Sequence, residues 1–407
     1  MDDFRKGWPI ILCGLIGVAA SSVNITVYTM ALLAPELSSS FGWKVSEVQA
    51  VHIPATIALV CTLPIVGILT DKFGPRIVGL TSAAILGVGL LLFSLIDTLA
   101  QFFLLSIMIS VGGAGTLAVT WARMVNFWFT QRRGLALGIM LLGTGVGGSL
   151  LKPYTAALIS AFGWQGAYIG LGLLPLLLTL PLCFFKFHRP VSVEPGAVSD
   201  EQLVEQAQGV TTGQALSDWR FWALGLAMVP TAATIGAMIA NMEIMLESMN
   251  FGPDQRVAMA SFIGVSVIAG RLIGGWSLDR FNAGVVGATM ILVMAAGCLL
   301  MANPPLSTFA ALLVIASVGL CSGVEFDAIA FLVGRLFGLR SYSRIYSGIL
   351  MFYFMAGATG PFLFSRWKEE FGTYDFVLQM SAGALLVAAG LMLAIGLSRR
   401  PAFATAH

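Results

Sequence analysis

Charged residues are scarce in this chain. Asp, Glu, Lys and Arg make up 10% of the 407 residues, whereas about 25% is usual in a soluble domain. Hydrophobic residues make up 57%, and the mean hydropathy is +0.89. The net charge of +2 leaves no excess of basic residues of the kind that binds nucleic acid. These shortages exclude a soluble globular protein, and the long apolar runs predict a polytopic membrane protein in a lipid bilayer.

Motifs for metals, disulfides and nucleotides are missing as well. The five cysteines lie singly in apolar runs without C-x-x-C or Cys/His spacing, so we expect neither a disulfide framework nor a metal site. The glycines from Gly138 to Gly148 are not followed by Gly-Lys-Ser/Thr and do not form a phosphate loop. Because no nucleophile–base set lies on the expected helices, we expect no enzyme activity and no cofactor. No A-x-A-like site follows the first apolar run, so we expect no cleaved signal peptide.

Twelve apolar runs separated by polar turns predict an all-α membrane protein with twelve transmembrane helices in two sets of six. The expected spans are 8–34, 48–70, 77–97, 100–124, 134–158, 164–186, 219–244, 257–278, 283–303, 306–333, 345–365 and 376–397. The sequence thus predicts a six-helix bundle at 1–186, a linker at 187–218 and a second six-helix bundle at 219–407. Residues 199–205 of the linker could form a short surface helix.

Lys and Arg are distributed unevenly between the expected loops. Fifteen lie on the side that carries both termini and the linker, and four lie on the other side. The positive-inside rule places both termini and the linker in the cytoplasm. Short loops favour a bacterial inner membrane. The three remaining basic residues, Arg123, Lys152 and Arg271, lie within the expected helices.

The two halves carry a repeated stretch. Gly67-Ile68-Leu69-Thr70-Asp71-Lys72-Phe73 matches Gly275-Trp276-Ser277-Leu278-Asp279-Arg280-Phe281 at an offset of 208 residues (71 to 279), and the same offset relates Phe129 to Phe337. One offset at two separate places indicates a duplicated six-helix unit. Parallel repeats of this kind are typical of alternating-access transporters, whose binding site lies at the repeat interface near the membrane midplane.

These residues resemble the major facilitator superfamily over the whole chain. Gly67 to Arg76 is similar to that superfamily's signature between helices 2 and 3, with Pro75 at a usually basic position. The run Arg132 to Ile139, opening helix 5, and helix 8 with Arg271 resemble the monocarboxylate-transporter and oxalate/formate-antiporter group. The resemblance implies the superfamily's two-bundle fold, secondary transport, and a substrate-binding role for Arg271.

Two positions depart from that group. Val267 stands where animal members carry an aspartate one turn before the helix-8 arginine. The second basic residue of the oxalate exchanger, in helix 11, has no counterpart between Ile345 and Phe364. The coupling scheme of those relatives therefore does not transfer to this chain residue by residue.

Arg271 is the first candidate for substrate contact. It lies eight residues before Asp279, which places it about 12 Å inside the end of its helix and close to the midplane of a bilayer about 30 Å thick. A charge at that depth costs about 2.5 kcal/mol or more, and such residues usually serve a substrate or an ion. The guanidinium offers a planar fork that suits a carboxylate. The alternative is a permanent salt bridge with an intramembrane acid.

Glu325 and Asp327 are the obvious intramembrane acids. Glu325 lies ten residues before Arg335, about 15 Å inside the helix end, which is nearly the depth of Arg271. Residues i and i+2 of a helix point about 160° apart, so one acid can face a cavity while the other faces a neighbouring helix. A buried carboxylate beside an arginine can exchange a proton as a substrate enters and leaves, which makes both acids candidates for proton coupling. The alternative is a static partner that neutralises Arg271 or Arg123.

Further polar side chains at suitable depths are candidate substrate contacts: Arg123, Lys152, Asn24, Tyr28, Asn241 and Tyr353. Arg123 could instead pair with helix 10. Lys152 could extend to the membrane surface or attract anions into an outward-facing vestibule. Each uncharged residue could equally form a hydrogen bond between helices.

A second group of charged residues lies in the turns at the expected cytoplasmic helix ends: Asp71, Arg76, Asp279 and Arg280. Such charges can lock an inner gate by pairing with the ends of neighbouring helices, and this gating role requires no substrate.

The combined pattern predicts a secondary transporter of a small organic anion, a mono- or dicarboxylate. We expect proton symport or exchange against a counter-anion, in a chain that acts as a monomer. The alternative within transport is a proton-driven efflux pump for hydrophobic or cationic compounds, and the alternative outside transport is a sensor of the same fold. Three intramembrane basic residues favour an anion as the cargo.

Overall fold

The computed structural model describes residues 2–129, 132–186 and 209–398. This part of the chain is almost entirely helical and contains no strand, only an isolated bridge between Gly209 and Gly338. The all-α architecture predicted from the sequence is therefore confirmed. The surface helix predicted at 199–205 lies outside the described residues. The chain divides into two compact units, which are described one at a time.

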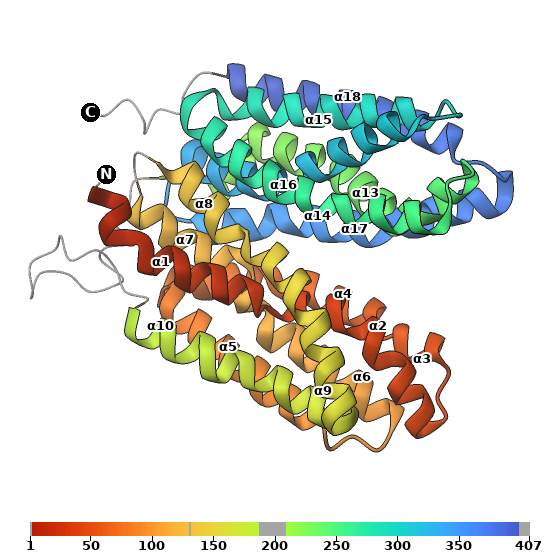
Figure 1. Cartoon of the computed structure of the whole chain (residues 1–407). Helices are drawn as coiled ribbons and strands as arrows, with labels where there is room; N and C mark the ends of the chain where they lie inside the picture. Colours follow the sequence, from red (N-terminus) through yellow and green to blue (C-terminus); the bar gives the residue numbers. More distant parts are fainter. Residues whose placement is uncertain (1, 130–131, 187–208, 399–407) are drawn as a thin grey trace, which may run out of the picture. The chain divides into compact units, whose positions relative to one another are not determined.

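Unit 1 comprises residues 1–131, 139–209 and 338–347. Its helices, coloured red to yellow-green in Figure 1, are α1 (Asp2–Ala19), α2 (Ser22–Phe41), α3 (Val45–Gln49), α4 (His52–Phe73), α5 (Pro75–Phe93), α6 (Leu99–Gly112), η1 (Gly113–Thr116), α7 (Ala118–Trp128), the end of α8 (Arg133–Leu141), α9 (Gly143–Leu174), η2 (Pro175–Thr179) and α10 (Leu180–Lys186). One hydrophobic core of aliphatic and aromatic side chains joins α2, α5, α6 and α9.

Unit 2 comprises residues 132–138, 210–337 and 348–407. Its helices are the start of α8, then α12 (Thr212–Ser217), α13 (Trp219–Ser248), α14 (Pro253–Arg280), α15 (Ala283–Met301), α16 (Thr308–Phe337), most of α17 (Tyr342–Phe371), and α18 (Asp375–Leu397). Helices α14 and α16 lie side by side, as do α15 and α18 (Figure 1). The close packing of α14 on α16 depends on Gly270 and Gly323, because a Cβ atom at either position would meet the backbone of the other helix.

The described residues contain ten helices that are long and apolar enough to cross a membrane, or eleven if the bent pair formed by α1 and α2 counts as one span. One continuous stretch, Arg133–Lys186, turns at Gly163, which has a φ of 70° and a ψ of −173°. Glycine adopts this left-handed φ without the steric conflict that a Cβ atom introduces. The stretch therefore accommodates two of the predicted spans, 134–158 and 164–186. The observed helices are thus consistent with the predicted twelve transmembrane helices.

Two spans of unit 1 that the sequence predicts as continuous, 8–34 and 100–124, are broken instead. The first bends by 41° between α1 and α2, and the second passes through η1. The two breaks contact each other: the Ser22 N–H donates to Thr116 Oγ1 at 3.0 Å, and Ser22 Oγ donates to the Gly113 carbonyl at 3.3 Å. Polar groups at one helix break thus form hydrogen bonds with polar groups at the other. In an apolar surrounding, no water is present to supply these hydrogen bonds.

The observed units differ from the predicted boundaries by two short segments. Residues 132–138 belong to unit 2, and residues 338–347 belong to unit 1. Each segment includes the first turn of a helix, α8 or α17, and each is held by a carboxylate of the unit to which it belongs. Helix α12 lies within the predicted linker.

Candidate functional site

A buried carboxylate marks the end of α4 in unit 1. Asp71 accepts the backbone N–H groups of Ser343 and Arg344, at 3.1 and 3.2 Å, in the first turn of α17. The positive end of a helix dipole favours a carboxylate at this position. The buried guanidinium of Arg123 pairs with the same carboxylate and donates to Ser343 Oγ at 3.2 Å. Asp71 therefore joins three segments that are distant in the sequence.

Asp279 makes the equivalent contact in unit 2. Its two oxygens accept the N–H groups of Gly134 and Leu135, at 2.6 and 2.9 Å, in the first turn of α8. The neighbouring Arg280 guanidinium lies over the Trp276 ring, 4.3 Å from its centroid. The repeated sequence stretch thus produces the same carboxylate-to-helix contact twice.

The glycine four residues before each of these aspartates allows the close approach. A Cβ atom at Gly67 would lie 2.7 Å from the Ser343 carbonyl oxygen, and one at Gly275 would lie 2.7 Å from the Gly134 carbonyl oxygen. Real Cβ atoms essentially never come that near to a backbone oxygen. The spacing Gly-x-x-x-Asp therefore encodes both the approach and the carboxylate contact.

Arg271 and Asp327 form a buried ion pair in unit 2. Arg271 Nη1 lies 3.0 Å from Asp327 Oδ1, and the side chains are 4% and 0% exposed. Gly138 at the end of the 132–138 segment lies against this pair: a Cβ atom there would be 2.8 Å from the Arg271 carbonyl and 3.2 Å from Asp327 Oδ2. The sequence placed Glu325 at nearly the depth of Arg271 and left either acid as a possible partner, and the structure pairs Arg271 with Asp327.

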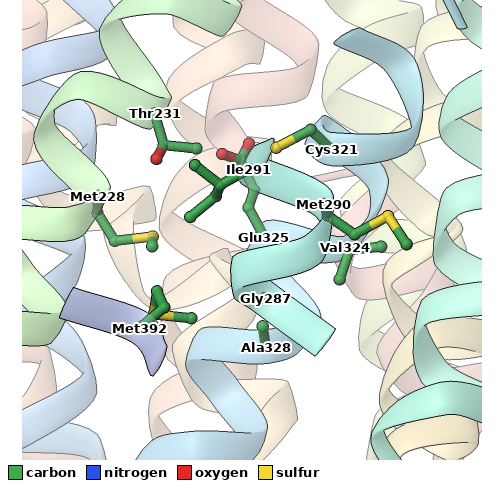
Figure 2. Close-up of a pocket in the computed structure, with 10 residues that line it drawn as sticks. All are labelled: Met228, Thr231, Gly287, Met290, Ile291, Cys321, Val324, Glu325, Ala328 and Met392. Atoms are coloured by element: carbon green, nitrogen blue, oxygen red, sulfur yellow. The ribbon is translucent and has the colours of Figure 1, made fainter. Parts of the chain in front are cut away.

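Glu325 lies on the same helix as Asp327 but has different partners. Tyr353 of α17 donates its hydroxyl to Glu325 Oε1 at 2.7 Å. The other oxygen, Oε2, is buried and has no hydrogen-bond partner among the described residues. The side chain lines a cavity between α13, α15, α16 and α18 (Figure 2). Arg271, Asp327, Glu325 and Tyr353 therefore form one cluster, hereafter called the α14–α16 cluster.

The remaining basic candidates lie elsewhere. Arg123 is fully buried and paired with Asp71 in unit 1, which favours a structural role over a substrate contact. Lys152, on α9, is exposed. Arg76 donates to the Phe184 carbonyl and lies over the Phe184 ring, 5.5 Å from its centroid. The contacts of Arg123 and Arg76 hold helices of unit 1 to one another.

The uncharged candidates separate into two kinds. Asn241 donates to the Ala237 carbonyl at 2.9 Å and accepts hydroxyl groups from Ser365 and Tyr374, so it joins α13 to the end of α17 and the turn after it. Asn24 donates to the Val18 carbonyl across the bend between α1 and α2. Tyr28 packs on Gly148 of α9. Of the four, only Tyr353 contacts an ionisable member of the α14–α16 cluster.

Sequence reasoning missed the residues that surround Glu325. The cavity is lined by Thr231, Cys321, Met228, Met290 and Met392, together with small and aliphatic side chains. A threonine and three methionines on apolar helices carry no distinctive spacing, because methionine is a common filler of irregular gaps. These residues come together around Glu325 only because four helices pack there.

Comparisons with known proteins agree with this fold. Monocarboxylate transporter 13 of Rattus norvegicus is 25% identical over 341 residues, which cover 82% of this chain and 76% of that protein. Monocarboxylate transporter 11 of Mus musculus is 24% identical over 411 residues, covering 98% and 88%. The crystal structure of the fucose:proton symporter of E. coli covers 96% of this chain and 98% of its own, with a TM-score of 0.69 at 16% identity, a likeness of fold. The model of the Major Facilitator Superfamily matches residues 14–361. The chain belongs to this family of multi-pass membrane transporters.

Proposed function

We propose that this protein is a secondary transporter of a small organic anion, a mono- or dicarboxylate, and that Arg271 is its main substrate contact. The observation that carries the proposal is the buried pair itself: the guanidinium already binds one carboxylate, that of Asp327, at 3.0 Å. A charge-assisted bond of this kind strengthens where water is excluded. The relatives that are named monocarboxylate transporters support an anionic cargo.

The substrate carboxylate takes the place of Asp327 on the guanidinium. Asp327 then lies buried without its partner, which is strongly unfavourable for an ionised group. A proton on Asp327 removes that penalty, so proton and substrate enter together. Exchange against a second anion is the other solution, because the outgoing anion leaves Arg271 as the incoming anion arrives. Glu325, in the same cluster, is the second candidate for the coupled proton.

The proposed gating residues are Asp71, Arg76, Asp279 and Arg280. Each aspartate holds the first turn of a helix through two backbone N–H groups. A contact made of a few hydrogen bonds and a helix dipole is weak enough to open and close during alternating access. The distribution of Lys and Arg supports cytoplasmic termini. The short loops favour a bacterial inner membrane, and we propose a monomer as the working unit.

Efflux of hydrophobic cations is the competing function, with Glu325 and Asp327 as the binding carboxylates. The Arg271–Asp327 pair argues against it. A cation that bound Asp327 would displace Arg271 and leave a buried guanidinium without its carboxylate, whereas an anion keeps the guanidinium paired. Drug sensitivity of a strain that lacks the gene measures this alternative directly.

The test is uptake of radiolabelled organic acids by proteoliposomes, guided by a thermal-shift screen at two pH values. We expect Arg271→Ala to abolish uptake and substrate-induced stabilisation. Arg271→Lys should recover little, because the planar fork is lost. Arg256→Ala is the matched control, since Arg256 forms a partly exposed pair with Glu247 at 2.8 Å. Full uptake by a properly inserted Arg271→Ala protein would refute the assignment.

A further inference from the structure

The cavity beside Glu325 lies inside unit 2, between α13, α15, α16 and α18 (Figure 2). It leaves room for about one water-sized sphere. Figure 2 shows the Glu325 carboxylate pointing toward the part of the cavity that Thr231 and Cys321 line. Of the ten lining residues drawn there, Glu325 is the only one with a carboxyl group, and none carries a basic side chain. Proton coupling alone does not explain why a carboxylate points into an otherwise apolar cavity.

The hydrogen bonds around Glu325 are incomplete in a specific way. Oε1 accepts from Tyr353, and Oε2 is buried without a partner in the described part of the chain. The Thr231 hydroxyl donates its hydrogen to the Ala227 carbonyl at 2.8 Å, so its oxygen keeps lone pairs for a donor. A protonated Glu325 fits this arrangement, because Oε1 is then the carbonyl oxygen that accepts from Tyr353 and Oε2–H is a donor that requires an acceptor.

The charges of the cluster also favour a proton on Glu325. Arg271 and Asp327 are paired and neutralise each other, which leaves Glu325 as a surplus negative charge. The ionisable groups that interact with it are Tyr353 of α17, Arg271 of α14, and Asp327 and Cys321 of α16. The side chains that α13, α15 and α18 contribute to the cavity are uncharged. An ionised carboxylate without its own counter-ion in this surrounding is very costly, so the neutral acid is favoured.

The free space of the cavity suits one water molecule and not a metal cation. Water-sized space amounts to about one molecule, and a bridging water needs two or more polar partners, which Glu325 and Thr231 provide. A hard cation prefers a shell of oxygen ligands. The lining of the cavity is instead largely apolar, with three methionines and a cysteine among the ten residues.

We propose that one water molecule occupies this cavity, that it accepts the Glu325 O–H and donates to Thr231 Oγ1, and that Glu325 keeps its proton throughout the transport cycle. Asp327 is then the carboxyl group that gains and loses the coupled proton. This division of roles rests on the proposed function. The water site and the held proton stand on the contacts around Glu325.

Transport by two amide variants tests the division of roles. Glu325→Gln preserves a neutral donor, and we expect proton-driven accumulation to persist with an initial rate reduced no more than about fivefold. Asp327→Asn should lower accumulation driven by a pH gradient by more than about tenfold, while anion exchange continues. If Glu325→Gln loses pH-driven accumulation and retains exchange, Glu325 carries the coupled proton and the inference is overturned.

Infrared spectroscopy of the purified protein tests the held proton without any substrate. We expect the C=O stretch of a protonated carboxyl group at neutral and mildly alkaline pH, lost in Glu325→Gln. Thr231→Val should shift that band, because the water loses its acceptor, whereas the matched Thr231→Ser should leave it in place. A wild-type spectrum without the band, or a band unchanged in Thr231→Val, contradicts the proposal. Because this measurement needs no substrate, it separates failure of the inference from failure of the proposed function.

Discussion

The buried arginines of the two units are held in different ways. In unit 1, Arg123 lies on α7 and pairs with Asp71, the carboxylate that also holds the start of α17. In unit 2, Asp279 holds the start of α8 without a buried arginine at the position that matches Arg123, which is occupied by Phe331 at the repeat offset of 208 (123 to 331). Arg271 is placed on α14 and pairs with α16. The repeat therefore preserves the helix-end contact, while the buried charges have diverged.

The same offset relates a helix break to a buried acid. Glu325 of α16 corresponds to Leu117 (117 to 325), the extended residue between η1 and α7. Unit 1 interrupts its helix at this position and satisfies the released backbone groups with Ser22 and Thr116. Unit 2 keeps its helix continuous and inserts a carboxyl group. Both arrangements place polar groups inside an apolar bundle, but only that of unit 2 introduces an ionisable side chain.

Neutralising each buried pair should give the largest difference between the units. We expect Arg271→Gln/Asp327→Asn to reduce uptake more than about a hundredfold, because the substrate loses its guanidinium. Asp71→Asn/Arg123→Gln should reduce uptake less than about tenfold, since neutral hydrogen bonds replace a structural pair. The measurement is initial uptake in proteoliposomes at equal protein content. If the two double variants lose uptake to the same extent, the units do not differ in function as proposed.

Single neutralisation should affect stability more than double neutralisation in both units. Arg271→Gln leaves Asp327 buried without its counter-ion and should cost about 3–5 kcal/mol. Arg123→Gln leaves Asp71 with only the more exposed Arg344, 3.5 Å away, and should cost less. The double variants should recover most of this loss. Thermal unfolding in detergent measures the effect. Single variants as stable as the wild type would show that neither pair is needed for folding.

Adding a methyl group at Gly67 or Gly275 should have the next largest effect on stability. Gly67→Ala and Gly275→Ala place a methyl group against a backbone carbonyl, and we expect a loss of about 1–3 kcal/mol at each. Gly264→Ala, also on α14, is the matched control, because a Cβ atom there has open space and alanine favours a helix by about 1 kcal/mol. Equal stability of Gly275→Ala and Gly264→Ala would contradict the close approach.

The helix-end carboxylates should differ by a smaller amount. Asp279→Asn removes a charge from the start of α8, which corresponds to about 0.3–2 kcal/mol and a modest change in transport rate. Asp71→Asn should have a larger effect, because it also removes the carboxylate that pairs with the buried Arg123. The unfolding temperature and the uptake rate, measured for both variants, show which substitution has the larger effect. A larger effect at Asp279 would reverse the comparison.

The smallest effects are expected at the two asparagines. Asn241→Ala removes the acceptor of two hydroxyl groups in unit 2 and should cost about 0.5–1.5 kcal/mol. Asn24→Ala loses a donor to the Val18 carbonyl in unit 1 and should cost a similar amount. Substrate affinity should change little in both variants. A large loss of affinity in either one would restore that asparagine as a substrate contact.

Helix period and residue depth allowed part of the cluster to be predicted. Counting from Asp279 and Arg335 placed Arg271 and Glu325 at nearly the same depth, and the two acids of α16 were predicted to point in different directions. Their different partners agree with that geometry. Which acid pairs with the arginine was not predictable, because the rotation of α16 against α14 is set by glycine contacts on both helices. The breaks in unit 1 were missed for a similar reason: the groups that satisfy them come from another helix.

The sequence by itself determined the class of the molecule. Its long, continuous apolar runs suit a lipid surrounding, where a helix satisfies the backbone N–H and C=O groups by hydrogen bonds within the segment. It also determined the repeat, since Gly-x-x-x-Asp recurs at a fixed offset. Tertiary structure alone decided that Asp327 pairs with Arg271, that Asp71 pairs with Arg123, and that Glu325 and Thr231 line one cavity. The reason is physical: a buried charge takes its properties from the few groups within hydrogen-bond reach, and helix packing selects those groups.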